Sequence, residues 1–102
     1  IMGMGYGVIE NLAYDESGKV LAASLGEYKI PNIQDIPELN TVIVRSDFGS
    51  GPYNSISNGE TALIPTAAAI ANAVQDAVGV RIKSLPITAE KVLNALKGKR
   101  SD

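Results

Sequence analysis

The segment Pro65-Thr66-Ala67-Ala68-Ala69-Ile70-Ala71-Asn72-Ala73-Val74 decides how this chain folds, because it carries the clearest helix signal in the sequence. Pro65 suits the first turn of a helix, where its fixed φ and missing N–H are tolerated. Gly79 suits the position just after the last turn. The spacing therefore predicts a helix over 65–78, which its alanines keep slim enough for close packing.

A polar, glycine-bearing loop over 54–62 leads into this helix and places Glu60 near the helix N-terminus. The helix dipole and its unpaired N–H groups favour negative charge there, so one interpretation of Glu60 is purely structural. The wider loop over 46–60 is long and irregular, and loops of more than about 12–15 residues tend to be functional or disordered. It lacks the lysine and hydroxyl residue of a phosphate-binding loop, so we exclude nucleoside triphosphate binding.

The remaining pattern predicts an α+β fold, a small mixed domain with two to three helices and a short sheet. A second helix is expected over 88–97, with Thr88 as its cap and Gly98 as its stop. A glycine-rich helix is expected over 2–13, where a neighbouring element can approach the backbone closely. Strands are expected over 20–23 and 39–45, the latter because of its β-branched run.

Composition excludes several classes of function. The chain has 102 residues, a net charge of −2, and neither cysteine nor histidine. Zinc sites and catalysis by cysteine or histidine are therefore excluded. The charge argues against nucleic acid or an anionic membrane as a partner, and no apolar run approaches the roughly 20 residues of a membrane span. We expect a cytoplasmic protein.

Residues 1–102 are expected to be a single domain or a fragment. The chain opens on Ile1 without a polar lead-in, which indicates an internal start in a longer protein or a separately encoded piece of one. Its hydrophobic content of 45 % suits a piece that packs against other domains. In isolation, such exposed apolar surface predicts a homo-oligomer.

Five separated stretches carry a resemblance to a known family. They are 1–7 with Glu10, 27–31 with 35–37, the pair Gly59-Glu60, 65–73, and 79–82 with 85–88. In this order they resemble the C-terminal part of the molybdopterin-binding (large) subunit of the molybdenum hydroxylases. That family contains xanthine dehydrogenase, aldehyde oxidase and carbon monoxide dehydrogenase. The resemblance runs from residue 1 to about residue 97, and five short motifs in register are specific.

The resemblance implies a catalytic role for Glu60. A glutamate in a Gly-Glu pair of the family takes the proton from a hydroxyl on molybdenum during hydroxylation of an aldehyde, a purine or a similar substrate. Glu60 stands at the matching position. The cofactor contacts that the resemblance implies are Met2, Gly3, Ser57, Asn58 and Gly59.

The resemblance also implies a cofactor and partners. The cofactor is molybdenum-molybdopterin, in its simple or its dinucleotide form, whose dithiolene holds the metal without a protein ligand. We expect it in the full assembly and not on the isolated chain, which we expect to be inactive. The implied partners are the remaining parts of the molybdopterin-binding subunit and the iron–sulfur and flavin subunits.

Two alternatives stay open at the level of sequence. The chain is a non-catalytic structural or self-associating remnant of such a subunit if Glu60 only caps a helix. Met2 in place of the family's glutamine, and Thr61-Ala62 in place of its frequent double proline, favour that alternative. The other alternative is a free-standing small-ligand binding domain without molybdenum, which only the loop over 46–60 favours.

Overall fold

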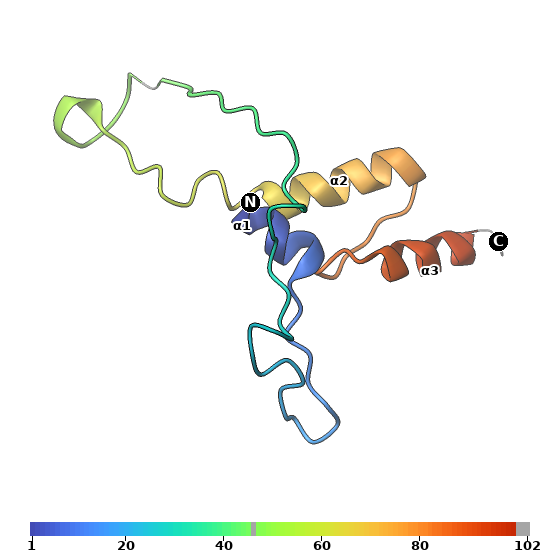
Figure 1. Cartoon of the computed structure of the whole chain (residues 1–102). Coiled ribbons are helices and arrows are strands. Elements are labelled where there is room, and N and C mark those ends of the chain that lie inside the picture. Colours follow the sequence, from blue (N-terminus) through green and yellow to red (C-terminus); the bar gives the residue numbers. More distant parts are fainter. Residues whose placement is uncertain (46, 100–102) are drawn as a thin grey trace.

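Helices and the links between them form the body of the molecule, and two long excursions of the chain leave that body (Figure 1). The computed structural model describes residues 1–45 and 47–99. In these residues the element order is α1 (Met2–Met4), the π-helical turn η1 (Gly5–Ile9), the 3-10 turn η2 (Pro52–Asn54), α2 (Thr66–Val78) and α3 (Ala89–Lys99).

The predicted glycine-rich helix is present but shorter than expected. It consists of α1 and η1 and ends at Ile9, because Glu10 takes an extended conformation with φ −75° and ψ 122°. Its glycines allow close approach to α2. A Cβ added at Gly3 would lie 2.6 Å from Cβ of Thr66, and one added at Gly7 would lie 3.3 Å from Cδ1 of Ile70. These glycines therefore place α1 and η1 directly against the first half of α2.

The helix predicted over 65–78 is confirmed as α2, which begins one residue after Pro65. Gly79 ends it in the left-handed conformation, with φ +70°, and donates its N–H to the carbonyl of Gln75 at 2.8 Å. Glycine adopts this conformation without the steric cost that a side chain brings. The stop signal read from the sequence is therefore the one the structure uses.

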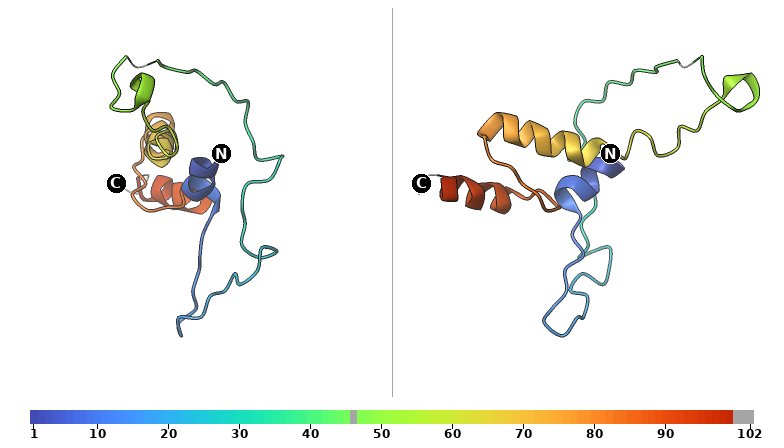
Figure 2. Two further views of the ribbon diagram at one scale, coloured as in Figure 1. Left: turned by 90° about the vertical axis from the view of Figure 1, so that its left-hand side faces the viewer. Right: turned by 180° about the vertical axis from the view of Figure 1, so that it is seen from behind.

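The second predicted helix is confirmed as α3, which lies beside α2 (Figures 1 and 2). Thr88 accepts a hydrogen bond at Oγ1 from the N–H of Lys91 at 3.2 Å, as expected of a cap. The expected stop at Gly98 was wrong, because α3 runs on to Lys99. A glycine inside a helix costs only about 1 kcal/mol relative to alanine, which does not by itself end the helix.

The α+β prediction was wrong for the part of the chain that the structure describes, which contains helices and no strand. Near 20–23 there is only an isolated antiparallel bridge between Tyr14 and Val20, which closes the turn over 15–19. Residues 39–45 are extended but pair with no neighbour among the described residues. The β-branched run favours an extended backbone, yet a strand also needs a partner, which residues 1–45 and 47–99 do not supply.

The described residues bury little apolar surface. The radius of gyration is 17.9 Å, whereas a compact domain of this length has about 13 Å. Buried apolar side chains are limited, among the described residues, to Ala67, Val80, Pro86 and Ile87. No helix in 1–45 or 47–99 has the length and hydropathy of a membrane span. The expectation of a single domain or fragment over 1–102 stays a prediction.

Candidate functional site

A pocket of about 310 Å³ lies where α1 meets the start of α2. It brings together Met2 and Gly3 from α1 with Gly59 and Glu60 from the loop before α2. These are four of the six residues that the sequence singled out as site residues. The full lining is Ile1, Met2, Gly3, Gly59, Glu60, Ala62, Leu63 and Thr66.

Backbone hydrogen bonds fix the turn that carries Glu60. The carbonyl of Glu60 accepts hydrogen bonds from the N–H of Leu63 at 2.9 Å and from that of Ile64 at 3.2 Å. Thr66 donates its hydroxyl to the carbonyl of Ala62 at 2.9 Å. Tyr6 of η1 donates its hydroxyl to the carbonyl of Leu63 at 3.2 Å. The turn is thus tied both to α2 and to the glycine-rich helix.

The Glu60 side chain is exposed at this pocket. Pro65 occupies the N-cap position of α2, and no side chain makes a capping hydrogen bond there. Within 1–45 and 47–99, the Glu60 carboxylate has no hydrogen-bond partner. A carboxylate without such partners keeps its lone pairs available to accept a proton.

Ser57 and Asn58 lie outside this pocket. They line a second hollow of about 530 Å³ between residues 41–44 and residues 56–62. Its other lining residues are Thr41, Val42, Ile43, Val44, Ile56, Thr61 and Ala62. The predicted site residues therefore fall into two groups, with Ser57 and Asn58 in this hollow and the other four in the pocket of Glu60. Ala62 belongs to both linings and connects them.

Sequence reasoning missed Tyr6, Leu63 and Thr66. Tyr6 fixes the turn without lining the pocket, whereas Leu63 and Thr66 line it. The hydrogen bond of Thr66 could have been predicted from the sequence, since a hydroxyl residue at the start of a helix commonly hydrogen-bonds to nearby backbone. The hydrogen bond of Tyr6 could not have been predicted, because its partner is 57 residues away in the sequence.

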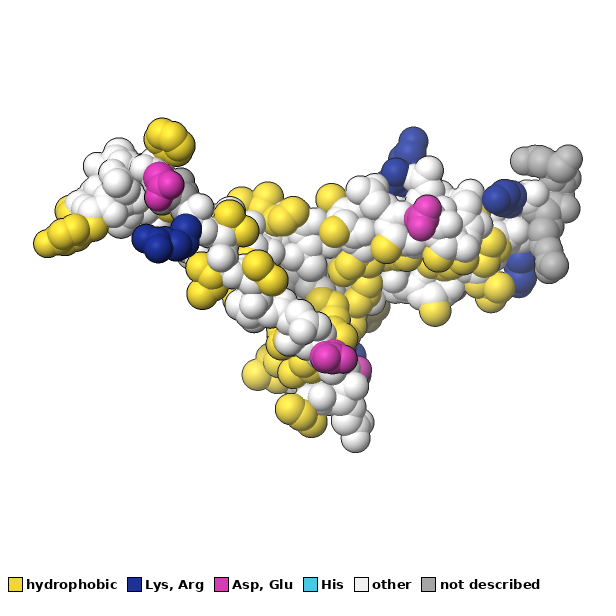
Figure 3. Space-filling view, turned by 90° about the horizontal axis from the view of Figure 1, so that it is seen from above, with side chains coloured by type: hydrophobic (Ala, Val, Ile, Leu, Met, Phe, Trp, Pro, Cys, Tyr) yellow, Lys and Arg dark blue, Asp and Glu magenta, His cyan; other side chains and the backbone are white. Residues whose placement is uncertain are grey.

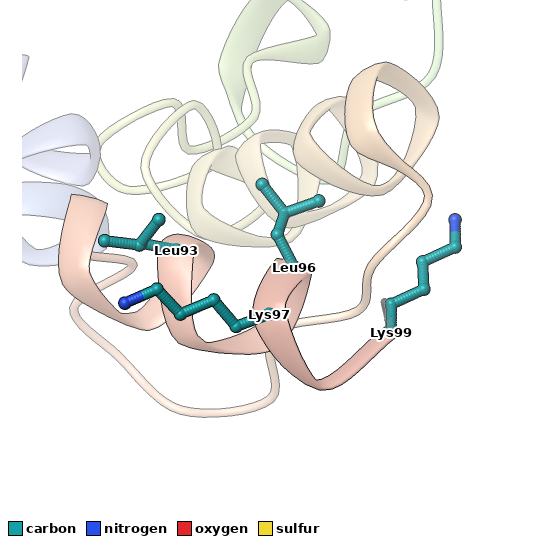
Figure 4. Close-up of a pocket in the computed structure, with 4 residues that line it drawn as sticks. All are labelled: Leu93, Leu96, Lys97 and Lys99. Atoms are coloured by element: carbon teal, nitrogen blue, oxygen red, sulfur yellow. The ribbon is translucent and has the colours of Figure 1, made fainter. Parts of the chain in front are cut away.

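A third hollow, of about 550 Å³, lies beside α3 and is lined by Leu93, Leu96, Lys97 and Lys99. Figure 4 shows Leu96 pointing from α3 toward α2. The hollow beside α3 contains none of the site residues expected from the sequence. We therefore place the candidate site at the pocket of Glu60.

The chemistry of the Glu60 pocket suits a cofactor that carries its own metal ligands. The described residues contain no group of three or more carboxylate, histidine or cysteine side chains that could hold a metal ion. The pocket contributes one carboxylate, one hydroxyl and exposed backbone, and a Cβ added at Gly59 would meet nothing within 4 Å. A bulky group can therefore approach the backbone at Gly59 beside the carboxylate.

Comparison with known proteins identifies the family. Residues 1–37 match the model of the molybdopterin cofactor-binding domain. The putative xanthine dehydrogenase molybdenum-binding subunit XdhA of Escherichia coli K12 is 39 % identical over 92 residues, which cover 89 % of this chain. The chain belongs to the molybdenum hydroxylase family. The resemblance read from the sequence is thereby confirmed.

Two further molybdenum hydroxylase relatives from the same organism show similar coverage. The aldehyde oxidoreductase molybdenum-binding subunit PaoC is 37 % identical over 97 residues, 93 % of this chain and 13 % of the relative. The probable hypoxanthine oxidase XdhD is 36 % identical over 98 residues, 95 % of this chain and 10 % of the relative. The chain spans 12 % of the length of XdhA. The three relatives thus share this segment within much longer proteins.

Proposed function

We propose that this chain is the C-terminal part of the molybdopterin-binding subunit of a molybdenum hydroxylase and that Glu60 is its catalytic base. The observation that carries the proposal is the pocket that joins Met2 and Gly3 to Gly59 and Glu60. Met2 and Gly3 belong to residues 1–37, which match a molybdopterin cofactor-binding domain. Glu60 is the only carboxylate among the lining residues, so the pocket places it next to the matched segment.

The residues of the pocket have different proposed roles. Met2, Gly3 and Gly59 would hold the cofactor, with Ser57 and Asn58 completing its surroundings from the adjacent hollow. When bound, the molybdenum-molybdopterin cofactor, in its simple or dinucleotide form, supplies the oxidation–reduction chemistry. Glu60 accepts at a carboxylate oxygen the proton that the attacking oxygen releases as it bonds to the substrate carbon.

The hydrogen-bonded turn supports this role of Glu60. Proton transfer requires a base within about 3 Å of the proton donor, so the carboxylate must be held in place. The bonds from Leu63 and Ile64 to the Glu60 carbonyl and from Tyr6 to Leu63 hold the backbone of the base. The side chain remains exposed at the pocket, where a substrate can reach it.

The proposal also covers substrate, partners and location. The names of the relatives favour an aldehyde or a purine such as xanthine or hypoxanthine as the substrate. The remaining parts of the molybdopterin-binding subunit, together with iron–sulfur and flavin subunits, would complete the enzyme in the cytoplasm. The isolated chain would then bind no cofactor and turn over no substrate, because most of the enzyme lies outside these residues.

The deciding experiment is to purify the native assembly that contains this chain and to compare Glu60→Gln with the wild type. We expect unchanged molybdenum content and a fall in turnover of an aldehyde or a purine by about 10²–10⁴-fold, the usual contribution of a general base. Glu16→Gln, at an exposed turn far from the pocket, is the matched control and should keep full activity.

Two results would contradict the proposal. Full activity in Glu60→Gln would show that this carboxylate is not the base. Purified assembly without molybdenum would favour the alternative of a non-catalytic structural or self-associating remnant. The exposed large apolar side chains of the described residues are the observation that favours this alternative.

A further inference from the structure

Residues 38–45, which we call the outgoing arm, form the first part of the long loop that leaves the helical body (Figures 1 and 2). At the centre of the outgoing arm, Val42, Ile43 and Val44 are 83 %, 86 % and 87 % exposed. Figure 3 shows apolar side chains gathered on this excursion as well as over the helices. Three adjacent β-branched side chains in water are unusual, since apolar surface of this kind is normally covered.

The backbone of the outgoing arm is also unpaired. Within the described part of the chain, none of its N–H or C=O groups makes a hydrogen bond. The run Thr41-Val42-Ile43-Val44 is β-branched throughout, which disfavours a helix and favours an extended backbone. Such a segment offers a row of donors and acceptors to any partner that can pair with it.

Charges stand only at the two ends of the outgoing arm. Glu38 begins it, Arg45 ends it, and the residues between them carry no charge. Proteins keep permanently exposed edges from pairing by placing charges or prolines within them. The outgoing arm has neither device in its interior, so its sequence suits a covered position.

The outgoing arm also borders an unfilled space. The hollow of about 530 Å³ separates Thr41, Val42, Ile43 and Val44 from the returning arm, which carries Ile56, Ser57 and Asn58. Its lining is mostly apolar in the outgoing arm and mixed in the returning arm. A partner that pairs with the outgoing arm would place its own side chains in this hollow.

We infer that the outgoing arm docks, by backbone pairing, on the open edge of a β-sheet in the remaining part of the molybdenum-binding subunit. The sheet belongs to that partner, and this chain adds one segment to it. Because side chains of an extended segment alternate, Val42 and Val44 face one side and Ile43 the other. Both faces of the partner sheet must therefore be apolar at this edge, over about 26 Å for eight residues.

The remaining part of the subunit is a better candidate for the partner of the outgoing arm than a second copy of this chain. XdhA is matched over only 12 % of its length, so most of a relative lies outside the aligned segment and can contribute a sheet. Two copies pairing through their outgoing arms would make a two-stranded ribbon, which is marginally stable in water. The inference rests on the proposed place of the chain in a larger subunit, but not on catalysis by Glu60.

Hydrogen exchange of the native assembly tests the inference without any substitution. We expect every second amide within 39–44 to exchange at least about 100-fold more slowly in the assembly than in the isolated chain. Docking on an edge protects alternate amides, because every second N–H points toward the partner. Fast exchange at all of these amides in the assembly would overturn the inference.

Photo-crosslinking identifies the occupant. A photoreactive phenylalanine in place of Val44 should crosslink to the larger part of the subunit, whereas one in place of Gln34, exposed in a neighbouring loop, should not. Crosslinks between two copies of residue 44, with protection that grows with concentration of the isolated chain, would show self-pairing and overturn the inference. If the native protein contains no larger molybdenum-binding part, whether as the same or a separate polypeptide, the proposed function fails as well; if it contains one while 39–44 exchange fast, only this inference fails.

Discussion

The hydroxyl of Tyr6 donates a hydrogen bond to the carbonyl oxygen of Leu63 at 3.2 Å. This bond joins two segments that are far apart in the sequence, the glycine-rich helix and the turn that begins at Glu60. Tyr6 lies within the stretch that matches the molybdopterin cofactor-binding domain. The bond therefore couples the proposed cofactor side of the pocket to the proposed base.

Tyr6→Phe should lower turnover of the native assembly by less than about tenfold while leaving molybdenum bound. One neutral hydrogen bond contributes about 0.5–1.5 kcal/mol, and its loss loosens the turn without removing the carboxylate. Steady-state kinetics on the purified assembly measure the effect. Tyr14→Phe is the matched control, because the Tyr14 hydroxyl makes no hydrogen bond in the described part of the chain. Equal turnover in both variants would show that the bond does not position Glu60.

Gly3→Ala should destabilise the contact between α1 and α2. The added Cβ would lie 2.6 Å from both Cβ and Oγ1 of Thr66, which forces one helix to move. Overpacking of this kind costs about 1–3 kcal/mol. Thermal unfolding of the assembly should show a lower midpoint for Gly3→Ala. Gly98→Ala, where an added Cβ meets nothing within 4 Å, should leave the midpoint unchanged or raise it.

The phenol of Tyr28 should titrate above its ordinary range. It donates a hydrogen bond to Oε2 of Glu10 at 3.0 Å, and this bond, then desolvation and the negative charge of Glu10, raise the pKa of Tyr28 above 10.0. Because the folded state favours the protonated phenol, the stabilisation is fully present below pH 10.0 and is lost as the pH rises through the folded pKa. Phenolate absorbance, with Tyr28→Phe to assign the signal, follows this titration.

Glu10→Gln should shift the titration of Tyr28 to lower pH, because it replaces the carboxylate that accepts the hydrogen bond of the protonated phenol and removes the negative charge that opposes phenolate formation. Glu16→Gln, in the exposed turn over 15–19, should leave that titration where it is. An unchanged midpoint for Tyr28 in Glu10→Gln would refute the assigned cause.

Lys91→Met should loosen the link between α2 and α3. The Lys91 ammonium donates to the carbonyls of Ser84, Leu85 and Pro86 at 3.3, 3.2 and 2.9 Å. Methionine keeps an apolar side chain of similar length but removes the donors, at an expected cost of about 1 kcal/mol. Amide exchange at residue 87, whose N–H bonds to the Gly7 carbonyl at 2.7 Å, should become faster. Lys83→Met, with an exposed side chain, should not change it.

The fold could be predicted from the sequence where local signals decide it. Pro65 and Gly79 bound α2, and Thr88 caps α3, because each acts on backbone groups within a few residues. The strand over 39–45 was wrong because β-branched residues select an extended backbone but cannot supply a neighbour to pair with. The first helix ends early at Ile9, where Glu10 turns extended and its carboxylate accepts a hydrogen bond from Tyr28, a contact over 18 residues that no local pattern encodes.

The candidate site could be predicted only in part. The loop before α2 was recognisable from its polar and glycine residues, and the pocket unites Met2 and Gly3 with Gly59 and Glu60. Ser57 and Asn58 line the neighbouring hollow together with residues 41–44, which are distant in the sequence and could not be placed there from local patterns. The role of Tyr6 could not be predicted, because its hydrogen bond depends on how α1 and η1 pack on α2. That packing is a relationship between distant segments.

The long excursion begins and ends at neighbouring residues of η1. A Cβ added at Gly5 would lie 3.1 Å from the ring of Pro31, and Tyr6 bonds to Leu63, so residues 32–62 form a loop with both ends fastened at one place. The entropy of closing such a loop grows only with the logarithm of its length, by about 0.6 kcal/mol for each doubling. Insertions at the far turn, near η2, therefore carry a small energetic penalty and leave the fastened ends in place. The reach of this loop can therefore be lengthened while the carboxylate of Glu60 keeps its position beside α1.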